Sequence, residues 1–411
     1  MAAETAQHTA RSPHAGAAPC FLCALDAQPC AIHSLEGAPV RIAGHDTRRG
    51  QLAVRLAGTT RGDVTILPPD HTRPLLRDLA ALSEEQRRAL RLRAYHLGPI
   101  GAEDAAAETE RETAGPLRAG PAGALVLEPD LLLNITDINN AEYCARQYPL
   151  RRMIPSPPTE ATLRGTIIHQ TFKELLKAGA PGDPAPHLAR ALRAAAPDLA
   201  LRQVSASAMR DAITPHLDAL TRWYAQARES LWGGETGIRA ETFRLAPEVG
   251  LKGRLDILRT SAEGEAFIEL KTGEVRAELP RRQHRWQVHG YQTLLAVRHP
   301  ERRQRAGATL LYSGTPGQAE GYGIPFSLRE LHRVLDLRNR LAVIHATGAV
   351  PPPPGPRKCA RCALRVECAR ASALLGWEPP TLEDAPPPVA PSDAAWFATE
   401  YARLRLEARA T

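Results

Sequence analysis

The chain has 411 residues, a length that suggests two or three domains. Its apolar content of 43% is sufficient for packed cores, which argues against a disordered chain or a small disulfide scaffold. Its 52 Lys and Arg against 45 Asp and Glu give a net charge of +7, which favours nucleic acid as a partner, although a GC-rich coding sequence also enriches Arg. No run reaches about 18 apolar residues, so we expect a cytoplasmic protein that is not bound to a membrane.

The N-terminal third alternates short apolar runs with glycines. Residues 1–18 are small and polar, and we expect them to be mobile. Residues 31–75 read as a small antiparallel sheet or barrel. A helix is predicted from Ser83 to Gly98, and residues 101–123 are predicted to form a linker or an exposed connection.

A denser core begins at residue 125. A short helix capped by Thr136 or Asp137 is predicted to carry Cys144. An amphipathic helix follows over residues 165–179. Residues 184–232 show the same helical spacing of apolar residues twice more, which predicts two further helices.

The C-terminal half mixes strands and helices. Two strands flank the turn at residues 261–265, and a helix is predicted over 283–297. A strand at 308–314 precedes a long amphipathic helix at 328–347, after which the proline run at 350–356 forces an extended chain.

The two strands around the turn carry three residues with a chemical pattern. Glu269 and Lys271 are two apart, so they project from one face of a strand, whereas Leu270 points into the core. Asp256 lies in the preceding strand, where a hairpin brings it beside Glu269. Two carboxylates and a lysine suit Mg²⁺ or Mn²⁺ and the hydrolysis of a phosphodiester, with Lys271 orienting the attacking water. The alternative is a set of ordinary surface charges on a hairpin.

Two helices carry further candidates. His169 lies beside an apolar stripe, where a lone histidine is more often a core residue, yet its imidazole could bind the same metal and would favour Mn²⁺. Gln287 and Tyr291 are four residues apart and share a helical face that could aim at the lysine or at DNA.

These motifs, GTxxH, GLKGRLDI, IELKTG and QxxxY, resemble in order the RecB-like branch of the PD-(D/E)XK nucleases. Within it the chain is most similar to the nuclease module of the eukaryotic helicase/nuclease that processes Okazaki-fragment flaps. The resemblance implies a DNA nuclease of repair, replication or phage defence, acting on single strands or flaps. It also implies metal ligands at His169, Asp256, Glu269 and the Leu270 carbonyl, a catalytic Lys271, and support from Gln287 and Tyr291.

The fold class that follows is α/β, with a PD-(D/E)XK core, flanking helices and a small N-terminal β-rich domain. The predicted segments are a mobile cysteine-containing N-terminus at 1–30, a β-rich domain with helix and linker at 31–120, a nuclease domain at 121–375, and a Pro-rich linker with a short helix at 376–411.

Four cysteines frame the predicted nuclease core. Cys359, Cys362 and Cys368 lie more than two hundred residues after Cys144, and such a set suits zinc or an iron-sulfur cluster. A division of one and three is more typical of a cluster, and the resemblance implies a structural [4Fe-4S] cluster. A second possible zinc site comprises Cys20, Cys23, Cys30 and His33, whose alternative is a set of free thiols.

No GxxxxGK[ST] phosphate loop is present, so a helicase would have to be a separate protein. Basic clusters at 281–285 and 301–305 could contact DNA phosphates or be solvated helix ends. Two alternatives to the flap nuclease stay open. They are an exonuclease of the CRISPR-adaptation type and a non-catalytic DNA-binding subunit of a helicase-nuclease complex.

Overall fold

A computed structural model describes the chain in two compact units, formed by residues 1–127 with 296–301 and by residues 128–295 with 302–411. Each unit is treated by itself. The structure describes residues 21–26, 30–38, 40–46, 51–99, 117–154, 159–178, 182–232, 237–261, 264–273, 280–298, 307–315, 317–382 and 390–410.

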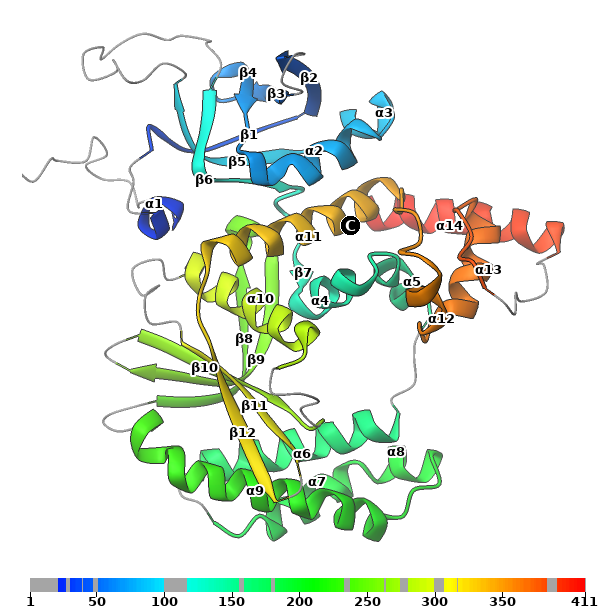
Figure 1. Ribbon diagram of the computed structural model, residues 1–411. Coiled ribbons are helices and arrows are strands. Elements are labelled where there is room, and N and C mark those ends of the chain that lie inside the picture. The colour runs from blue at the N-terminus through cyan, green and yellow to red at the C-terminus, as the bar shows by residue number, and fades with distance from the viewer. Residues whose placement is uncertain are drawn as a thin grey trace, which may run out of the picture. The chain divides into compact units, whose positions relative to one another are not determined.

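The first unit is built on a six-stranded sheet in the order β1-β5-β6-β4-β3-β2. Its strands are β1 (Ile32–Gly37), β2 (Val40–Asp46), β3 (Gln51–Thr59), β4 (Gly62–Leu67), β5 (Leu92–Pro99) and β6 (Leu117–Leu127). Pairing is antiparallel except between β4 and β6. Helices α1 (Phe21–Asp26), α2 (Arg73–Ala80) and α3 (Glu84–Arg88) complete the unit (Figure 1). The β-rich N-terminal region predicted from the sequence is confirmed.

The helix predicted from Ser83 to Gly98 is wrong in its second half. Ser83 does cap α3, through a capping box with Gln86, but that helix has only five residues. The chain then forms β5, whose two neighbours β1 and β6 supply backbone partners along its length. Sheet pairing and burial outweigh the helical spacing of the side chains here.

The linker predicted over residues 101–123 is also wrong in part. Residues 117–123 belong to β6, an 11-residue strand that pairs with β5, whereas residues 100–116 lie outside the described part. Glycine and alanine content lowered the strand signal, because small residues carry little of the β-propensity on which the prediction rests.

The second unit is built on a mixed sheet in the order β12-β11-β10-β9-β7, with β8 also paired to β9. Its strands are β7 (Leu133–Asn134), β8 (Gly237–Ala246), β9 (Leu251–Ser261), β10 (Gly264–Lys271), β11 (Ala308–Thr315) and β12 (Gln318–Ile324). β10 and β11 are parallel and are joined through α10 (Arg282–Arg298), because parallel strands need a crossover connection. The predicted hairpin, helix and following strand are confirmed, whereas β8 and β12 were not predicted.

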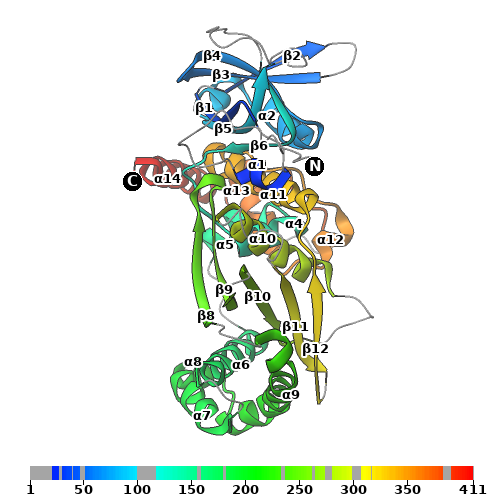
Figure 2. The ribbon, with the colours of Figure 1, turned by 90° about the vertical axis from the view of Figure 1, so that its left-hand side faces the viewer.

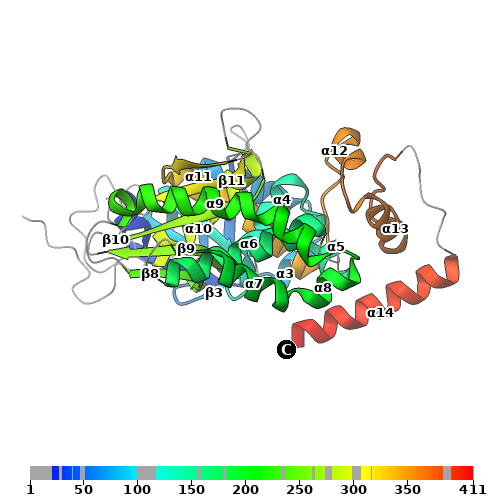
Figure 3. The ribbon, with the colours of Figure 1, turned by 90° about the horizontal axis from the view of Figure 1, so that it is seen from below.

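Helices lie on both sides of this sheet (Figures 1 and 2). One side is covered by α6 (Glu160–Lys177), α7 (Ala185–Ala194), α8 (Ala196–Leu201) and α9 (Ala206–Trp232), and Figure 3 shows this layer from below. Ile168 and Phe172 of α6 pack in one apolar core with Ile268 and Leu270 of β10. Because even positions of β10 face this core, its odd positions are left for the opposite side of the strand.

The other side carries α4 (Ile135–Tyr143), α10 and α11 (Leu328–Thr347). The predicted cap of α4 is wrong, because Asn134 occupies the N-cap position and Cys144 ends the helix. Arg338 of α11 is fully buried and donates to the carbonyls of Glu128 at 2.6 Å and Leu131 at 2.8 Å. These bonds fix α11 to the segment that enters β7.

The remaining elements lie on either side of the proline run in the chain. They are α5 (Gln147–Met153), which precedes it in the chain, and α12 (Pro356–Ala360), α13 (Arg365–Leu375) and α14 (Pro391–Ala410), which come after it. At 20 residues α14 is longer than the predicted tail helix. Within the described residues, no helix combines the length and the apolar character needed to cross a membrane.

Candidate active site

The site lies at the point where the backbone pairing between β9 and β10 ends. Their antiparallel pairing ends at Ile257 with Ile268, and one further step places Asp256 opposite Glu269. At this point the Asp256 side chain takes the place of a backbone carbonyl of β9, because its Oδ2 accepts a hydrogen bond from the Leu270 N–H at 2.9 Å. The carboxylate is thereby fixed by the backbone of the neighbouring strand.

Glu269 and Lys271 lie on the odd face of β10, opposite the apolar core. Glu269 is 2% exposed, and its Oε1 accepts from the Lys271 Nζ at 2.7 Å. The same ammonium donates to the Gln287 Oε1 of α10 at 2.8 Å. Leu270 is buried in the core as expected, so the lysine is held between one carboxylate and one amide.

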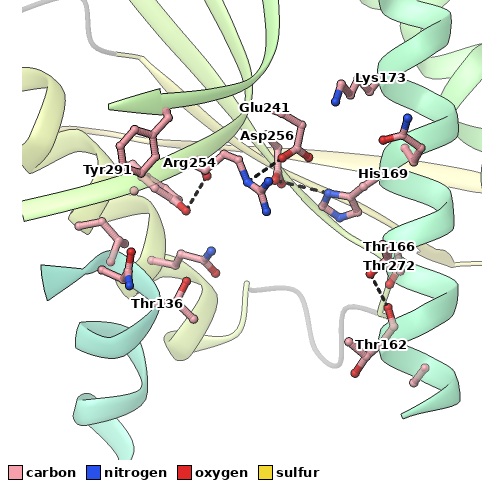
Figure 4. Close-up of a pocket in the computed structure, with 18 residues that line it drawn as sticks. Thr136, Thr162, Thr166, His169, Lys173, Glu241, Arg254, Asp256, Thr272 and Tyr291 are labelled. Atoms are coloured by element: carbon pink, nitrogen blue, oxygen red, sulfur yellow. Dashed lines mark hydrogen bonds and ion pairs between the residues drawn. The ribbon is translucent and has the colours of Figure 1, made fainter. Parts of the chain in front are cut away.

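His169 comes to the site from α6. Its Nδ1 lies 3.4 Å from the Asp256 Oδ1, and the ring points at that carboxylate (Figure 4). Gly165, one turn earlier, allows the approach of α6, because a Cβ there would lie 3.3 Å from the Thr272 Oγ1 at the end of β10. The structure therefore brings together the histidine, the aspartate and the end of β10.

Glu241 of β8 is a further acidic residue at the site that sequence reasoning missed. One ligand atom each from His169, Glu241 and Asp256 lie within 4.8 Å of one another. Glu241 has a positive φ of 53°, and the unbroken register of β8 with β9, from Ala240 with Ile257 to Thr242 with Leu255, sets it opposite Asp256. Its Oε2 pairs with the Arg254 Nε at 2.8 Å. No motif marks this residue, because only the pairing of β8 with β9 brings it near Asp256.

Burial and mutual repulsion set the protonation of the carboxylates. Burial, followed by the charge of Asp256, raises the pKa of Glu269 to about 7. Burial also disfavours the charged form of Asp256, but His169 and Lys271 outweigh it and hold that pKa below its usual range. Asp256 is therefore the ionised carboxylate of the two, and Glu269 is the one that binds a proton near neutral pH.

The two bases keep their protons more tightly than usual. Burial works against both cations, yet Asp256 outweighs it at His169 and Glu269 outweighs it at Lys271, so the pKa of each is raised. His169 lies beside Asp256 and Lys271 beside Glu269, so each base faces one carboxylate.

A pocket of about 790 Å³ opens beside these residues, between α6 and the strands (Figure 4). Hydroxyl, amide and cationic side chains line it, among them Thr162, Thr166, Gln170, Lys173, Arg254 and Gln287. Tyr291 also reaches it, but its hydroxyl donates to the Arg254 carbonyl at 2.8 Å. Its contact is therefore with β9 rather than with Lys271.

The four cysteines of the predicted cluster line one pocket of the second unit. Cys144 follows α4, whereas Cys359, Cys362 and Cys368 lie in and around α12 and α13. Burial raises the pKa of the Cys144 and Cys359 thiols. The lone cysteine and the trio are therefore adjacent in space although more than two hundred residues separate them.

Arg146 is a buried cation beside these cysteines that the sequence did not reveal. Its Nε donates to the Pro351 carbonyl at 2.7 Å and its Nη1 to the Glu378 carbonyl at 2.6 Å, on either side of the cysteine trio. The same Nη1 lies 4.0 Å from the Cys368 Sγ. Arg146 therefore fastens both ends of the trio's segment to the start of α5.

The N-terminal cysteine set is only partly described, because Cys20 lies outside the described residues. Cys23 and Cys30 are in contact, and the His33 Nδ1 lies 3.2 Å from the Cys30 Sγ. A residue absent from the predicted set, His96, joins them.

Comparison with known proteins identifies the second unit. The family model of the PD-(D/E)XK nuclease superfamily matches residues 133–369, more than half of the chain. The chain belongs to the PD-(D/E)XK nuclease superfamily. This PD-(D/E)XK domain has the α/β architecture predicted from the sequence, and members of the superfamily are typically nucleases that use Mg²⁺ or Mn²⁺ and act on DNA.

Other comparisons add little to the PD-(D/E)XK assignment. No curated protein matches the chain. A solved structure described as "Crystal structure of SSO0001" is 19% identical and covers 49% of this chain and 82% of its own, with a TM-score of 0.19. So low a TM-score carries no structural argument.

Proposed function

We propose that the chain is a RecB-like, metal-dependent DNA nuclease that cleaves single-stranded DNA or flaps. The observation that carries the proposal is the meeting of His169 and Asp256, which line one polar pocket, with Glu269 and Lys271 of the neighbouring strand. An acid pair with a lysine at this spacing suits phosphodiester hydrolysis better than a structural ion pair, because Glu269 is buried with a perturbed pKa.

The residues present fit a divalent metal ion. His169, Asp256 and Glu241 have ligand atoms within 4.8 Å of one another and would hold it. Glu269 and the Leu270 carbonyl of β10, which lie next to Asp256 but outside that group, would complete the set. Oxygen ligands suit Mg²⁺ or Mn²⁺, and the imidazole favours Mn²⁺. When bound, such an ion lowers the pKa of water and neutralises phosphate charge.

Lys271 is the proposed catalytic cation. Its raised pKa keeps it protonated at neutral pH, and Glu269 and Gln287 fix its ammonium in place. A fixed ammonium can hold the attacking water and stabilise the negative charge that develops on the phosphate. Gln287 acts by positioning this lysine, and Tyr291 by positioning the backbone of β9 at Arg254.

The pocket supports a single strand as the substrate. Its volume of about 790 Å³ falls in the range of small-ligand sites, which suits a few nucleotides better than a duplex. The hydroxyl of Thr162 on α6 can donate to a phosphate oxygen, and Lys173 adds a cation from the same helix. Binding of this kind depends strongly on salt concentration.

The cysteine pocket fits a [4Fe-4S] cluster, which we propose as a structural cofactor held by Cys144, Cys359, Cys362 and Cys368. Thiolates on one tetrahedral zinc lie about 3.8 Å apart. Among the described residues, the groups with ligand atoms all within 4.8 Å of one another do not include this quartet, which favours the larger cluster. The Gln147 Nε2 donates to the Cys362 Sγ at 3.7 Å, and such bonds stabilise cluster thiolates.

The test is cleavage of labelled single-stranded, flap and duplex DNA by the anaerobically purified chain with Mg²⁺ or Mn²⁺. Asp256→Asn is expected to slow cleavage by about a hundredfold or more, as for loss of a group that stabilises the transition state. Asp198→Asn, an exposed change on α8, is the matched control. Unchanged cleavage in Asp256→Asn would refute the site, and DNA binding without any cleavage would instead identify a non-catalytic DNA-binding subunit.

The cluster is tested on the same preparation. We expect iron and acid-labile sulfide in about equal amounts, and loss of both in Cys368→Ser. A colourless protein that contains zinc and no iron at these cysteines would overturn the cluster assignment.

A further inference from the structure

A second group of sulfur and imidazole ligands lies in the first unit, independent of the nuclease site. Cys23 is on α1, Cys30 precedes β1, and His96 lies within β5. The Cys23 Sγ is 3.1 Å from the Cys30 Sγ and 3.6 Å from the His96 Nδ1. One ligand atom from each of the three lies within 4.8 Å of the others.

Packing of α1 brings the cysteines to the histidine. Phe21 meets the Tyr95 ring edge-on with ring centroids 5.2 Å apart, and Leu22 is fully buried. These contacts place Cys23 over His96, which is 73 residues away in the chain. The group therefore forms only when α1 is docked on β5.

The backbone at His96 is unusual in a way that serves this arrangement. Its φ is 63°, and the pairing of β5 with β6 shifts register between Tyr95 and Leu97. A left-handed residue other than glycine inside a strand is costly, and such strain concentrates at functional sites. The pairing passes from Tyr95 with Ala124 to Leu97 with Ala119, so the extra residues of this bulge lie on β6 opposite His96.

The opposite strand makes room for the ring. Gly120 of β6 faces His96, and a Cβ on this glycine would lie 2.6 Å from the His96 Cδ2. His96 is itself 4% exposed and Cys30 is 8% exposed. A buried imidazole beside two buried or partly buried thiols is thus accommodated by a glycine that leaves space for it.

We propose that Cys23, Cys30 and His96 hold a structural zinc ion, with His33 as the fourth ligand. Zinc takes thiolate and imidazole ligands at about 2.3 and 2.0 Å, which places tetrahedral donors roughly 3.3–3.8 Å apart. The Cys23 Sγ lies 3.1 Å from the Cys30 Sγ and 3.6 Å from the His96 Nδ1, so small side-chain shifts would bring these three donors onto one ion. The His33 Nδ1 lies 3.2 Å from the Cys30 Sγ but outside that group of three, so its side chain would have to turn toward the ion. The assignment replaces Cys20 of the sequence-predicted set with His96.

The role of this zinc is to fasten α1 and the entry of β1 to the centre of the first sheet. A six-residue helix gains little stability from its own hydrogen bonds, so a metal link to β5 would fix its position. The site takes no part in phosphodiester hydrolysis.

The test measures zinc and iron in the full chain purified under reducing, anaerobic conditions. We expect about one zinc per chain, lost in Cys30→Ser and in His96→Asn, whose new residue tolerates a left-handed backbone. Iron content and DNA cleavage should stay unchanged, which separates this test from that of the nuclease. Zinc retained in both variants would overturn the site, and zinc lost from Cys20→Ser but not from His33→Asn would overturn the fourth ligand.

Because a variant can lose zinc by misfolding, a second measurement uses the unaltered chain. Zinc is extracted with a chelator and then restored, and alkylation of each cysteine is followed by mass spectrometry. Bound zinc should protect Cys23 and Cys30 at least tenfold. Equal alkylation with and without zinc, or a Cys23–Cys30 disulfide in the freshly purified protein, would exclude the proposal.

Discussion

Metal affinity at the active site should depend strongly on pH, because Glu269 must lose a proton to bind a cation. Burial and the charge of Asp256 raise its pKa to about 7. Below that pH a proton and the metal compete for the carboxylate. Affinity should therefore rise as pH increases from 6 to 8 and level off above 8.

The size of the effect follows from the pKa of Glu269. At pH 6 about 9% of a group with a pKa of about 7 is ionised, and at pH 8 about 91%, so affinity should rise about tenfold, or about 1.4 kcal/mol. A glutamate with the ordinary pKa would change the affinity by only about 2% over the same range. The pKa of His169 is also raised, so its proton steepens the dependence further. Asp256 adds nothing in this range, because its pKa is lowered.

Titration with Mn²⁺, followed through the electron paramagnetic resonance of the free ion, measures this dependence directly. Wild-type protein should gain at least tenfold in affinity between pH 6 and pH 8. His169→Asn should bind more weakly at every pH yet keep a rise of about tenfold, because Glu269 alone then titrates. An affinity that does not change across this range would refute the assignment of a proton to Glu269.

Three further changes test separate parts of the site. Lys271→Ala should lower the single-turnover cleavage rate by about a hundredfold while Mn²⁺ affinity changes little, and a large loss of affinity would show that the lysine supports the metal instead. Glu241→Gln should weaken Mn²⁺ binding about tenfold in the same titration, whereas an unchanged affinity would remove it from the ligand set. In Gly290→Ala the new Cβ would lie 2.6 Å from the Ile135 Cγ2 and force α10 away from α4. Urea unfolding should show a loss of about 1–3 kcal/mol, against little change in Gly323→Ala, where nothing lies within 4 Å, and equal curves for the two would exclude this packing argument.

Elements with a strong local pattern could be predicted from the sequence. The hairpin around the turn at 261–265, α10 and α11 follow from periodicity, and the two-residue spacing of Glu269 and Lys271 placed both on one face of β10. The fold class followed as well.

The features that sequence reasoning missed all depend on contacts between distant segments. Glu241 reaches the metal ligands only because the register of β8 with β9 sets it opposite Asp256. His96 meets Cys23 only because α1 docks on β5. Arg146 has no spacing that marks it, since its partners Pro351 and Glu378 lie more than two hundred residues away. Such pairings are set by tertiary packing, which periodicity does not encode.

The central claim is that Asp256 and Glu269 hold the metal ion that supports cleavage of DNA. Its most direct test is the single-turnover cleavage rate of labelled single-stranded DNA by the anaerobic protein and by Asp256→Asn, with the DNA fully bound in both. The account predicts a loss of about a hundredfold or more in the variant at equal DNA binding. Rates within twofold of each other would contradict it.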